Sequence, residues 1–192
     1  MTTLLPLEVL DLHSPEVVAE WERAFYQGFA HVTGNRLIQT LWIWNHAERR
    51  LATRIPYADQ LIYGWRDAAG TLATCLAINV TLAGFQSSAF GFQPDRSEGA
   101  PRACELLATF SLSDRSLSHV MQFRTTAFAD LYQRGFRRAY LTTADKNYRI
   151  WVRCGAELLD EAIIDGERRR FLQFTFTPSG IPAGTSSPLA QH

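Results

Sequence analysis

The chain has 192 residues, of which 46% are hydrophobic and 20% are charged, a balance typical of a globular domain with a substantial core. Lys and Arg together number 19, as do Asp and Glu, so the formal net charge is zero and a broad electrostatic surface for nucleic acid is not expected. The three cysteines, Cys75, Cys104 and Cys154, lie in apolar runs without close spacing. They predict neither a disulfide framework nor a zinc site.

The amino terminus lacks a basic segment followed by a long apolar run, and no apolar stretch reaches the roughly 18 residues of a membrane-spanning helix. Together with the free cysteines, this favours a cytoplasmic protein without a membrane partner. We expect a single domain over residues 1–177. The Ser-, Gly- and Pro-rich residues 178–192 are expected to form a disordered tail.

The first third of the chain predicts one strand and two helices. Residues 7–12 alternate loosely and indicate a strand. The sequence Ser14-Pro15-Glu16 is a helix start, with a capping Ser and then Pro at the first helical position, and apolar residues follow at helical spacing to Phe29. Apolar and aromatic residues between positions 37 and 51 predict a second helix that ends before Pro56.

The middle third predicts a hairpin, a long connection and a further strand. Residues 60–65 and 71–80 are strand-like runs on either side of a turn that contains Gly70. The connection 81–102 is rich in Gly, Ser and Phe, and loops of this length in a compact domain are usually functional. The strand 103–110 follows it.

The last third carries the clearest pattern. Asp165-Gly166 is a strong signal for a tight turn between two strands. The run Arg168-Arg169-Arg170 is interpreted as a solvated part of this hairpin. The predicted elements are an amphipathic helix over 117–136, a buried strand over 139–143, a short helix over 148–154, and hairpin strands over 157–164 and 168–176.

This order of elements, with Asn147 near the start of the last helix and Gly155 just after it, resembles the GNAT superfamily of N-acyltransferases. The resemblance implies an α/β (α+β) fold with a mixed central sheet flanked by helices. It also implies that the fourth and fifth strands, here 103–110 and 139–143, splay apart. The donor, acyl-CoA or acyl-phosphopantetheine, would bind as a co-substrate along the free edge of the fourth strand, with no permanently bound cofactor.

The donor-binding residues that the resemblance implies lie in the fourth strand, the segment after it and the last helix. The segment 111–118 would hold the donor's pyrophosphate at a helix start, but it lacks the family's glycines, which favours a donor on acyl carrier protein without the nucleotide. Asn147 either contacts the donor or caps the helix. The implied residues are Leu107, Thr109, Phe110, Ser111, Ser113, Arg115, Ser116, Asn147 and Trp151.

Glu105 is the predicted general base, which would take a proton from the attacking amine. Strand alternation predicts that Glu105 shares a face with Leu107 and Thr109. The alternative is a structural carboxylate paired with a nearby Arg. Trp151 occupies the position of the family's acidic Tyr and cannot protonate a thiolate, so Tyr148, one turn earlier, is the predicted general acid.

The long connection before the fourth strand and the acidic Glu105 resemble the branch of acyl-homoserine lactone and N-acyl amino acid synthases. Ala108 stands where the Glu-x-x-Arg signature of the lactone synthases has Arg. Phe85, Phe90 and Phe92 would either wall an acyl or acceptor pocket or pack the connection onto the sheet.

The implied function is N-acyl transfer from a pantetheine thioester to a small amine or amino acid. The missing Tyr and glycines favour an alternative, a non-catalytic module that binds acyl thioesters. No metal-ligand cluster or nucleophile motif is apparent, and His31, His46 and His119 are other candidate bases. The oligomeric state is left open, with a homodimer as one option.

Overall fold

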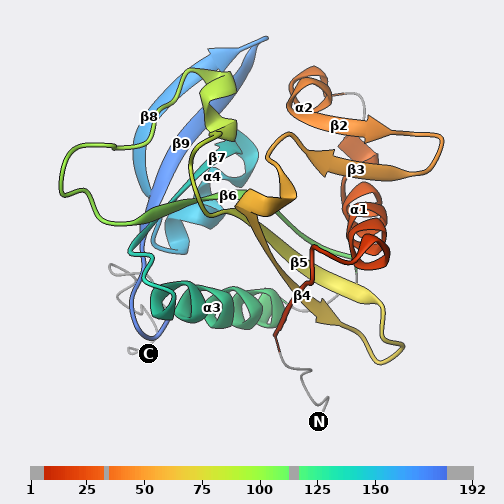
Figure 1. The fold of residues 1–192 in the computed structure, drawn as a ribbon. Coiled ribbons are helices and arrows are strands. Elements are labelled where there is room, and N and C mark those ends of the chain that lie inside the picture. Colours follow the sequence, from red (N-terminus) through yellow and green to blue (C-terminus); the bar gives the residue numbers. More distant parts are fainter. Residues whose placement is uncertain (1–6, 33–34, 113–116, 181–192) are drawn as a thin grey trace, which may run out of the picture.

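The computed structural model describes residues 7–32, 35–112 and 117–180. Its centre is a seven-stranded sheet in the order β1-β4-β5-β6-β7-β9-β8 (Figure 1). All neighbouring strands are antiparallel except β6 and β7, which are parallel. The strands are β1 (Glu8–Val9), β4 (Gln60–Arg66), β5 (Leu72–Asn79), β6 (Ala103–Ser111), β7 (Arg138–Ala144), β8 (Glu157–Ile164) and β9 (Glu167–Thr175).

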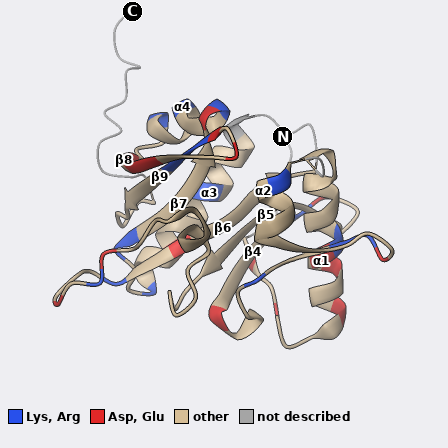
Figure 2. Cartoon of the chain, turned by 90° about the horizontal axis from the view of Figure 1, so that it is seen from above, with Lys and Arg blue, Asp and Glu red and all other residues tan. Residues whose placement is uncertain are grey.

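Helices cover both faces of this sheet, which confirms the predicted fold class. One face carries α1 and a separate two-stranded sheet, and the other carries α3 and α4 (Figure 1). The helices are α1 (Pro15–Phe29), α2 (Arg36–Leu41), α3 (Leu117–Gln133) and α4 (Asp145–Arg153), and the small sheet consists of β2 (Trp42–Asn45) and β3 (Arg50–Thr53). Both signs of charge occur on α1 and on α4, in keeping with the zero net charge (Figure 2).

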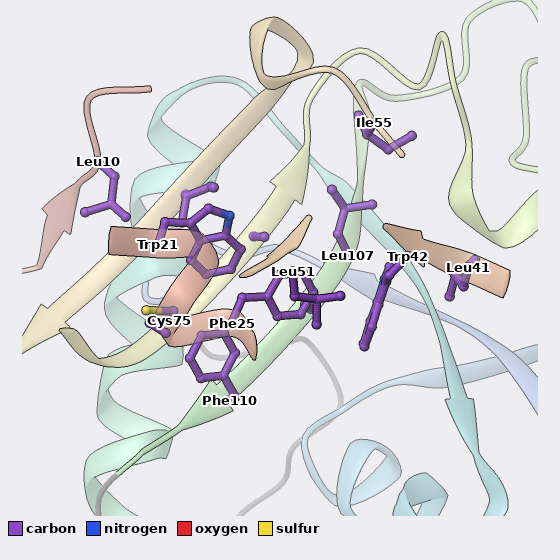
Figure 3. Packing of buried hydrophobic residues seen from close by; sticks show 14 of the residues in the cluster. Leu10, Trp21, Phe25, Leu41, Trp42, Leu51, Ile55, Cys75, Leu107 and Phe110 are labelled. Atoms are coloured by element: carbon purple, nitrogen blue, oxygen red, sulfur yellow. The ribbon is translucent and has the colours of Figure 1, made fainter. Parts of the chain in front are cut away.

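Aromatic and aliphatic side chains together form the core between α1 and the sheet (Figure 3). The ring of Phe25 stacks on those of Trp21 and Phe110, with centroids 5.0 and 5.9 Å apart. Gly28 allows this approach, since a Cβ at this position would come within 2.8 Å of the Phe110 ring. The residue type at position 28 therefore sets how closely α1 lies on β6.

Two local predictions are confirmed by the backbone. The Ser14 Oγ accepts a hydrogen bond from the Val17 N–H at 3.4 Å and caps α1, as the Ser-Pro-Glu pattern predicts. Asp165 and Gly166 join β8 to β9 with φ values of 50° and 79°. Two consecutive positive φ values are what a two-residue hairpin turn requires.

The predicted second helix is wrong beyond Leu41. The helix α2 ends there, and β2 and β3 pair as a hairpin in which Trp42 lies opposite Thr53. Trp42 is buried while Ile43 is 51% exposed, so the burial alternates from one residue to the next as in a strand. Aromatic and β-branched residues fit a pleated surface well, and this preference overrides the loose helical spacing.

The predicted disordered tail, residues 178–192, lies outside the described residues from position 181 onward.

Candidate active site: a cleft between two diverging strands

The central feature of the sheet is the short pairing of β6 with β7. The two strands pair over only three positions, of which the last joins Glu105 to Tyr140. Beyond that pair, β6 stays bonded to β5 as far as Ser111, and β7 stays bonded to β9 as far as Ala144. The facing edges of β6 and β7 therefore diverge toward their carboxyl ends, which confirms the predicted splay.

A cavity of about 240 Å³ occupies the gap between the diverging strands. Its walls are residues 106–109 of β6, residues 141–144 of β7 and the first two turns of α4. On the side toward α1 and α2, apolar side chains and a few polar ones close the cavity. The lining residues on that side are Phe29, His31, Val32, Asn35, Ile38, Leu41, Trp42, Gln86, Glu167 and Arg169.

A β-bulge shapes the β6 wall of this cleft. Ala77 of β5 pairs with Ala108 and Ile78 pairs with Leu106, so Leu107 is an extra residue without a partner in β5. Bulges bend a strand and are frequent beside active sites. The bulge also reverses the alternation after Leu107, so Thr109 points to the face opposite Glu105. The predicted common face for Glu105 and Thr109 is therefore wrong.

Glu105 is completely buried and does not line the cavity. Its carboxylate accepts hydrogen bonds from the Gln86 N–H at 2.9 Å, the Ser87 N–H at 2.7 Å, the Ser87 hydroxyl at 2.7 Å and the Asn79 amide at 3.2 Å. Burial raises the pKa of the Glu105 carboxyl, while these donors act in the opposite direction. The geometry fixes the connection 81–102 onto β6, and the role of general base stays a prediction.

The alternative for Glu105, a structural carboxylate paired with an Arg, is wrong because other groups hold this carboxylate. Its hydrogen-bond donors in the described part of the chain are backbone amides, one hydroxyl and one side-chain amide. These hydrogen bonds offset part of the cost of burying the carboxyl group.

Gln86 is a cleft residue that the sequence did not single out. Its Oε1 accepts a hydrogen bond from the Trp42 indole N–H at 3.0 Å, and its Nε2 donates to the Leu107 carbonyl at 3.2 Å. It thereby ties the β2–β3 hairpin to the bulge in β6. A polar residue in a Ser-rich loop gives no sequence signal of such a contact.

Two of the predicted donor-binding residues lie on α4 and line the cleft. Asn147 is the third residue of the helix, whose N-cap is Ala144, so the capping alternative for Asn147 is wrong. Trp151 lines the cleft one turn later and packs edge-on against Phe174 with centroids 5.8 Å apart. Leu107 and Thr109 line the β6 side.

Other predicted residues lie away from the cavity. The Phe110 ring is buried beneath α1, and the Ser111 hydroxyl lies 3.2 Å from the Thr74 hydroxyl. The ring of Tyr148 lies under the Arg170 guanidinium, with 3.9 Å from Cζ to the ring centroid, and is not part of the lining. Its role as general acid stays a prediction. Three predicted residues lie outside the described residues, namely Ser113, Arg115 and Ser116.

The arginine run at the start of β9 is divided by strand alternation. Arg168 is 45% exposed at its side chain, whereas Arg169 is 7% exposed and lines the cleft. The interpretation of the whole run as solvated is therefore wrong for Arg169. Glu167 lines the cleft beside it, accepting hydrogen bonds from the Arg169 Nη2 at 3.3 Å and from the Asn35 amide at 3.0 Å.

The three phenylalanines of the connection 81–102 are buried, but none of them lines the cleft. Phe90 lies under the Arg169 guanidinium at 5.3 Å, and Phe92 stacks on Phe171 at 5.1 Å. Phe92 and Phe171 line a second cavity of about 620 Å³ at the other end of the connection. All three rings pack the connection onto the sheet, and the pocket-wall alternative stays a prediction for Phe92, which lines the second cavity.

Of the candidate histidines, His31 lines the cleft, whereas the His46 Nδ1 lies 3.2 Å from the Tyr26 hydroxyl. Within the described ranges, no group of three or more His, Cys, Asp or Glu residues could hold a metal ion. None of the helices described is long and apolar enough to cross a membrane.

Solved structures of known proteins share this arrangement. No protein-family model and no curated protein sequence matches the chain. MesI, a CoA-dependent acyl-homoserine lactone synthase, matches with a TM-score of 0.70 and 13% identity, over 92% of this chain and 91% of its own. BjaI, another CoA-dependent acyl-homoserine lactone synthase, solved with SAM and isopentyl-CoA, matches with a TM-score of 0.69 and 11% identity, over 92% and 86% of the two chains.

A chimera of the spermidine N-acetyltransferase SpeG from Vibrio cholerae and hSSAT matches with a TM-score of 0.53 and 11% identity, over 89% of this chain and 96% of its own. Identities this low establish the fold alone. The chain has the GNAT fold, and the likeness to the lactone-synthase branch that the sequence predicts is confirmed at the level of the fold.

Proposed function

We propose that this protein is an N-acyltransferase that moves an acyl group from a pantetheine thioester to the amine of a small molecule or amino acid. The observation that carries the proposal is the cleft that opens beyond the Glu105–Tyr140 pair. Its walls are unpaired strand edges, and an extended chain with amide groups binds such an edge as an added strand does. The pantetheine arm is a chain of this kind.

In the proposed reaction the lone pair of a neutral amine attacks the thioester carbonyl carbon. The carbon–sulfur bond then breaks, an amide forms, and the departing thiolate takes up the proton that the amine loses and becomes the free thiol. Holding the two reactants together in the cleft removes most of the entropic cost of a bimolecular encounter. The names of the solved structures with this fold support the proposal, since they are acyl-homoserine lactone synthases and a spermidine N-acetyltransferase.

The second candidate is a non-catalytic module that binds acyl thioesters. The observation that favours it is Trp151, which lines the cleft at the position of the family's acidic Tyr. An indole N–H does not protonate a departing thiolate. A thiolate with a low pKa can leave without an acid, so the presence of Trp151 does not decide between the candidates.

Thiol release distinguishes the two functions. The protein would be incubated with acyl-CoA, acyl carrier protein thioesters and acyl-pantetheine, each with pools of amino acids and of amines, while free thiol and amide mass are followed. Acceptor-dependent thiol release with amide formation is expected. Donor binding without thiol release would establish the module instead, and the absence of donor binding would refute both.

A matched pair of variants ties any activity to the cleft. Thr142 is half-buried on the cleft wall, whereas Thr175 is exposed at the far end of β9. Thr142→Trp is expected to fill the cavity and abolish donor binding. Thr175→Trp adds the same ring outside the cavity and is expected to leave donor binding unchanged.

A further inference from the structure

Arg169 is a buried charged group of the cleft with an unpartnered donor. Its side chain is 7% exposed and lines the cavity. Its Nε is buried without a hydrogen-bond partner, and within the described residues the guanidinium makes one hydrogen bond, from Nη2 to Glu167 at 3.3 Å. A guanidinium has five donors, and leaving one of them, here the Nε–H, buried without a partner is costly unless an acceptor approaches it.

The residues around Arg169 hold it in place without neutralising it fully. The Phe90 ring lies 5.3 Å from Cζ, and burial lowers the pKa of the guanidinium while the neighbouring Glu167 acts in the opposite direction. Glu167 is 30% exposed at its side chain, and both of its hydrogen bonds in the described part of the chain use Oε2, one of them to Asn35. The Oε1 atom is left for another donor.

We infer that Arg169 and Glu167 form the acceptor subsite and bind the zwitterionic head of an α-amino acid, with its carboxylate on Arg169 and its ammonium group on Glu167. This inference rests on the proposed function and names its acceptor class. The pair carries one positive and one negative charge side by side, as the head group of an amino acid does. Charge-assisted hydrogen bonds to a planar guanidinium suit a carboxylate in particular.

The position of Arg169 argues for the acceptor rather than for the phosphates of the donor. Arg169 lies on the face of the sheet that carries α1 and α2, where it contacts Phe90 and, through Glu167, Asn35. The helix α3, whose start is the expected pyrophosphate site, packs on the opposite face. The donor and acceptor groups would therefore enter the cleft from opposite faces and meet between the strands.

A simple amine would gain less from this site. Its ammonium group could bind Glu167, but nothing in it would bind Arg169, and the buried cation would stay unsatisfied. An amino acid satisfies both residues at once. The amine nitrogen would then lie beside a carboxylate that can accept its proton before attack on the thioester.

The test compares acceptors that differ only in the carboxylate. Phenylalanine, phenylalaninamide and phenethylamine, with glycine and methylamine as a second series, would be measured for binding without donor and for thiol release with donor. The amino acids are expected to bind roughly 10- to 100-fold more tightly than their amines, the range of a charge-assisted hydrogen bond.

Three variants test whether Arg169 causes the preference for amino acids over amines. Arg169→Gln is expected to raise the KM for amino acids and to remove most of the preference over amines, whereas Arg169→Lys should retain part of it. Arg168→Gln is the matched control, since Arg168 is exposed and pairs with Glu161 on the neighbouring strand. Thermal unfolding and donor binding of each variant report its folding.

The outcomes separate the two proposals. Thiol release with amines and amino acids alike, or an equal effect of Arg169→Gln on both, would overturn the subsite and leave the acyltransferase intact. Binding that depends on the carboxylate and on Arg169 without any thiol release would support the subsite and refute the enzymatic function. If amino acids do not bind at all, in the presence or absence of donor, the subsite is refuted.

Discussion

Glu105 and Tyr140 face each other at the point where β6 and β7 separate, and both side chains hold the same long connection. Glu105 accepts hydrogen bonds from the backbone of Gln86 and Ser87, and the Tyr140 hydroxyl accepts one from the Asp95 N–H at 3.2 Å. The narrow end of the cleft is thus fastened from both strands to residues 81–102.

Replacing Glu105 by Gln tests whether its role is positional. An amide NH₂ cannot accept the bonds that the carboxylate accepts from Gln86 and Ser87, so we expect a loss of about 1–3 kcal/mol in unfolding free energy. The melting temperature should fall by roughly 2–12 °C. Calorimetry would measure this, with Glu98→Gln in the same connection, at an exposed position, as control.

The same variant separates the positional role from the predicted general base. A positional role predicts reduced activity at every pH, because Gln86 is no longer held at the cleft. A general base predicts a stable protein whose rate falls by roughly 10²- to 10⁴-fold and recovers at high pH, where more of the amine is already neutral. Recovery at high pH without loss of stability would contradict the positional role.

Glu105 also predicts a pH dependence of stability. Its folded-state pKa is raised above the ordinary value of 4.5 by burial. The protonated carboxyl therefore contributes stability that is fully present below about pH 4.5 and is lost as the pH rises through the raised pKa. The difference in unfolding free energy between wild type and Glu105→Gln should decrease over this window. Chemical denaturation at several pH values would measure it, and a difference that grows with pH would contradict the prediction.

Gln86 carries a second structural prediction. Gln86→Leu removes the acceptor for the Trp42 indole and the donor to the Leu107 carbonyl. Two buried polar groups lose their partner, so we expect the free energy of unfolding to fall by about 1–3 kcal/mol for each group that water does not reach. Donor binding should weaken as well, because the bulge at Leu107 loses its support. Gln93→Leu, at an exposed position of the same connection, is the control, and equal effects of the two variants would contradict this account.

The fold was largely predictable because its signals are local. The Asp165-Gly166 turn, the Ser14 cap and the apolar periodicity of α1 each act over a few residues. The β2–β3 hairpin was missed because its Trp residues satisfy helical and strand patterns alike, and only their pairing with β3 decides.

The candidate site was less predictable, because its geometry depends on contacts between distant segments. A bulge reverses the alternation after Leu107, and it arises from the pairing of β6 with β5. Gln86 reaches the cleft because the connection 81–102 folds back onto β6. Arg169 reaches it because its side chain lies on the inward-facing side of β9. Asn147 and Trp151 were found because a family resemblance supplied their spacing relative to Gly155.

The donor prediction follows from residues 111–118, which contain no Gly. Without the tight turn that glycines permit, the pyrophosphate of CoA gains little, so acyl-pantetheine and acyl carrier protein thioesters should compete well with acyl-CoA. We expect their KM values to lie within about tenfold of one another, which corresponds to a difference of at most about 1.4 kcal/mol in binding free energy. Competition for thiol release would measure this. A CoA thioester preferred by several orders of magnitude would show that serines replace the glycines.

Trp151 offers the last prediction, because one substitution places a phenol hydroxyl at the position of the family's acidic Tyr. Trp151 lines the cleft and packs edge-on against Phe174, and a Tyr ring at this position retains the packing while its hydroxyl adds a donor. If departure of the thiolate limits the rate, Trp151→Tyr should accelerate turnover by up to roughly 10²-fold, the lower end of general acid catalysis. The gain should be largest for alkyl thiols of high pKa and absent for aryl thiols, which leave without help. Trp151→Phe is the matched control, since it removes the indole without adding the hydroxyl. Thiol release across a series of leaving thiols would measure the effect, and equal rates for the Tyr and Phe variants throughout that series would contradict it.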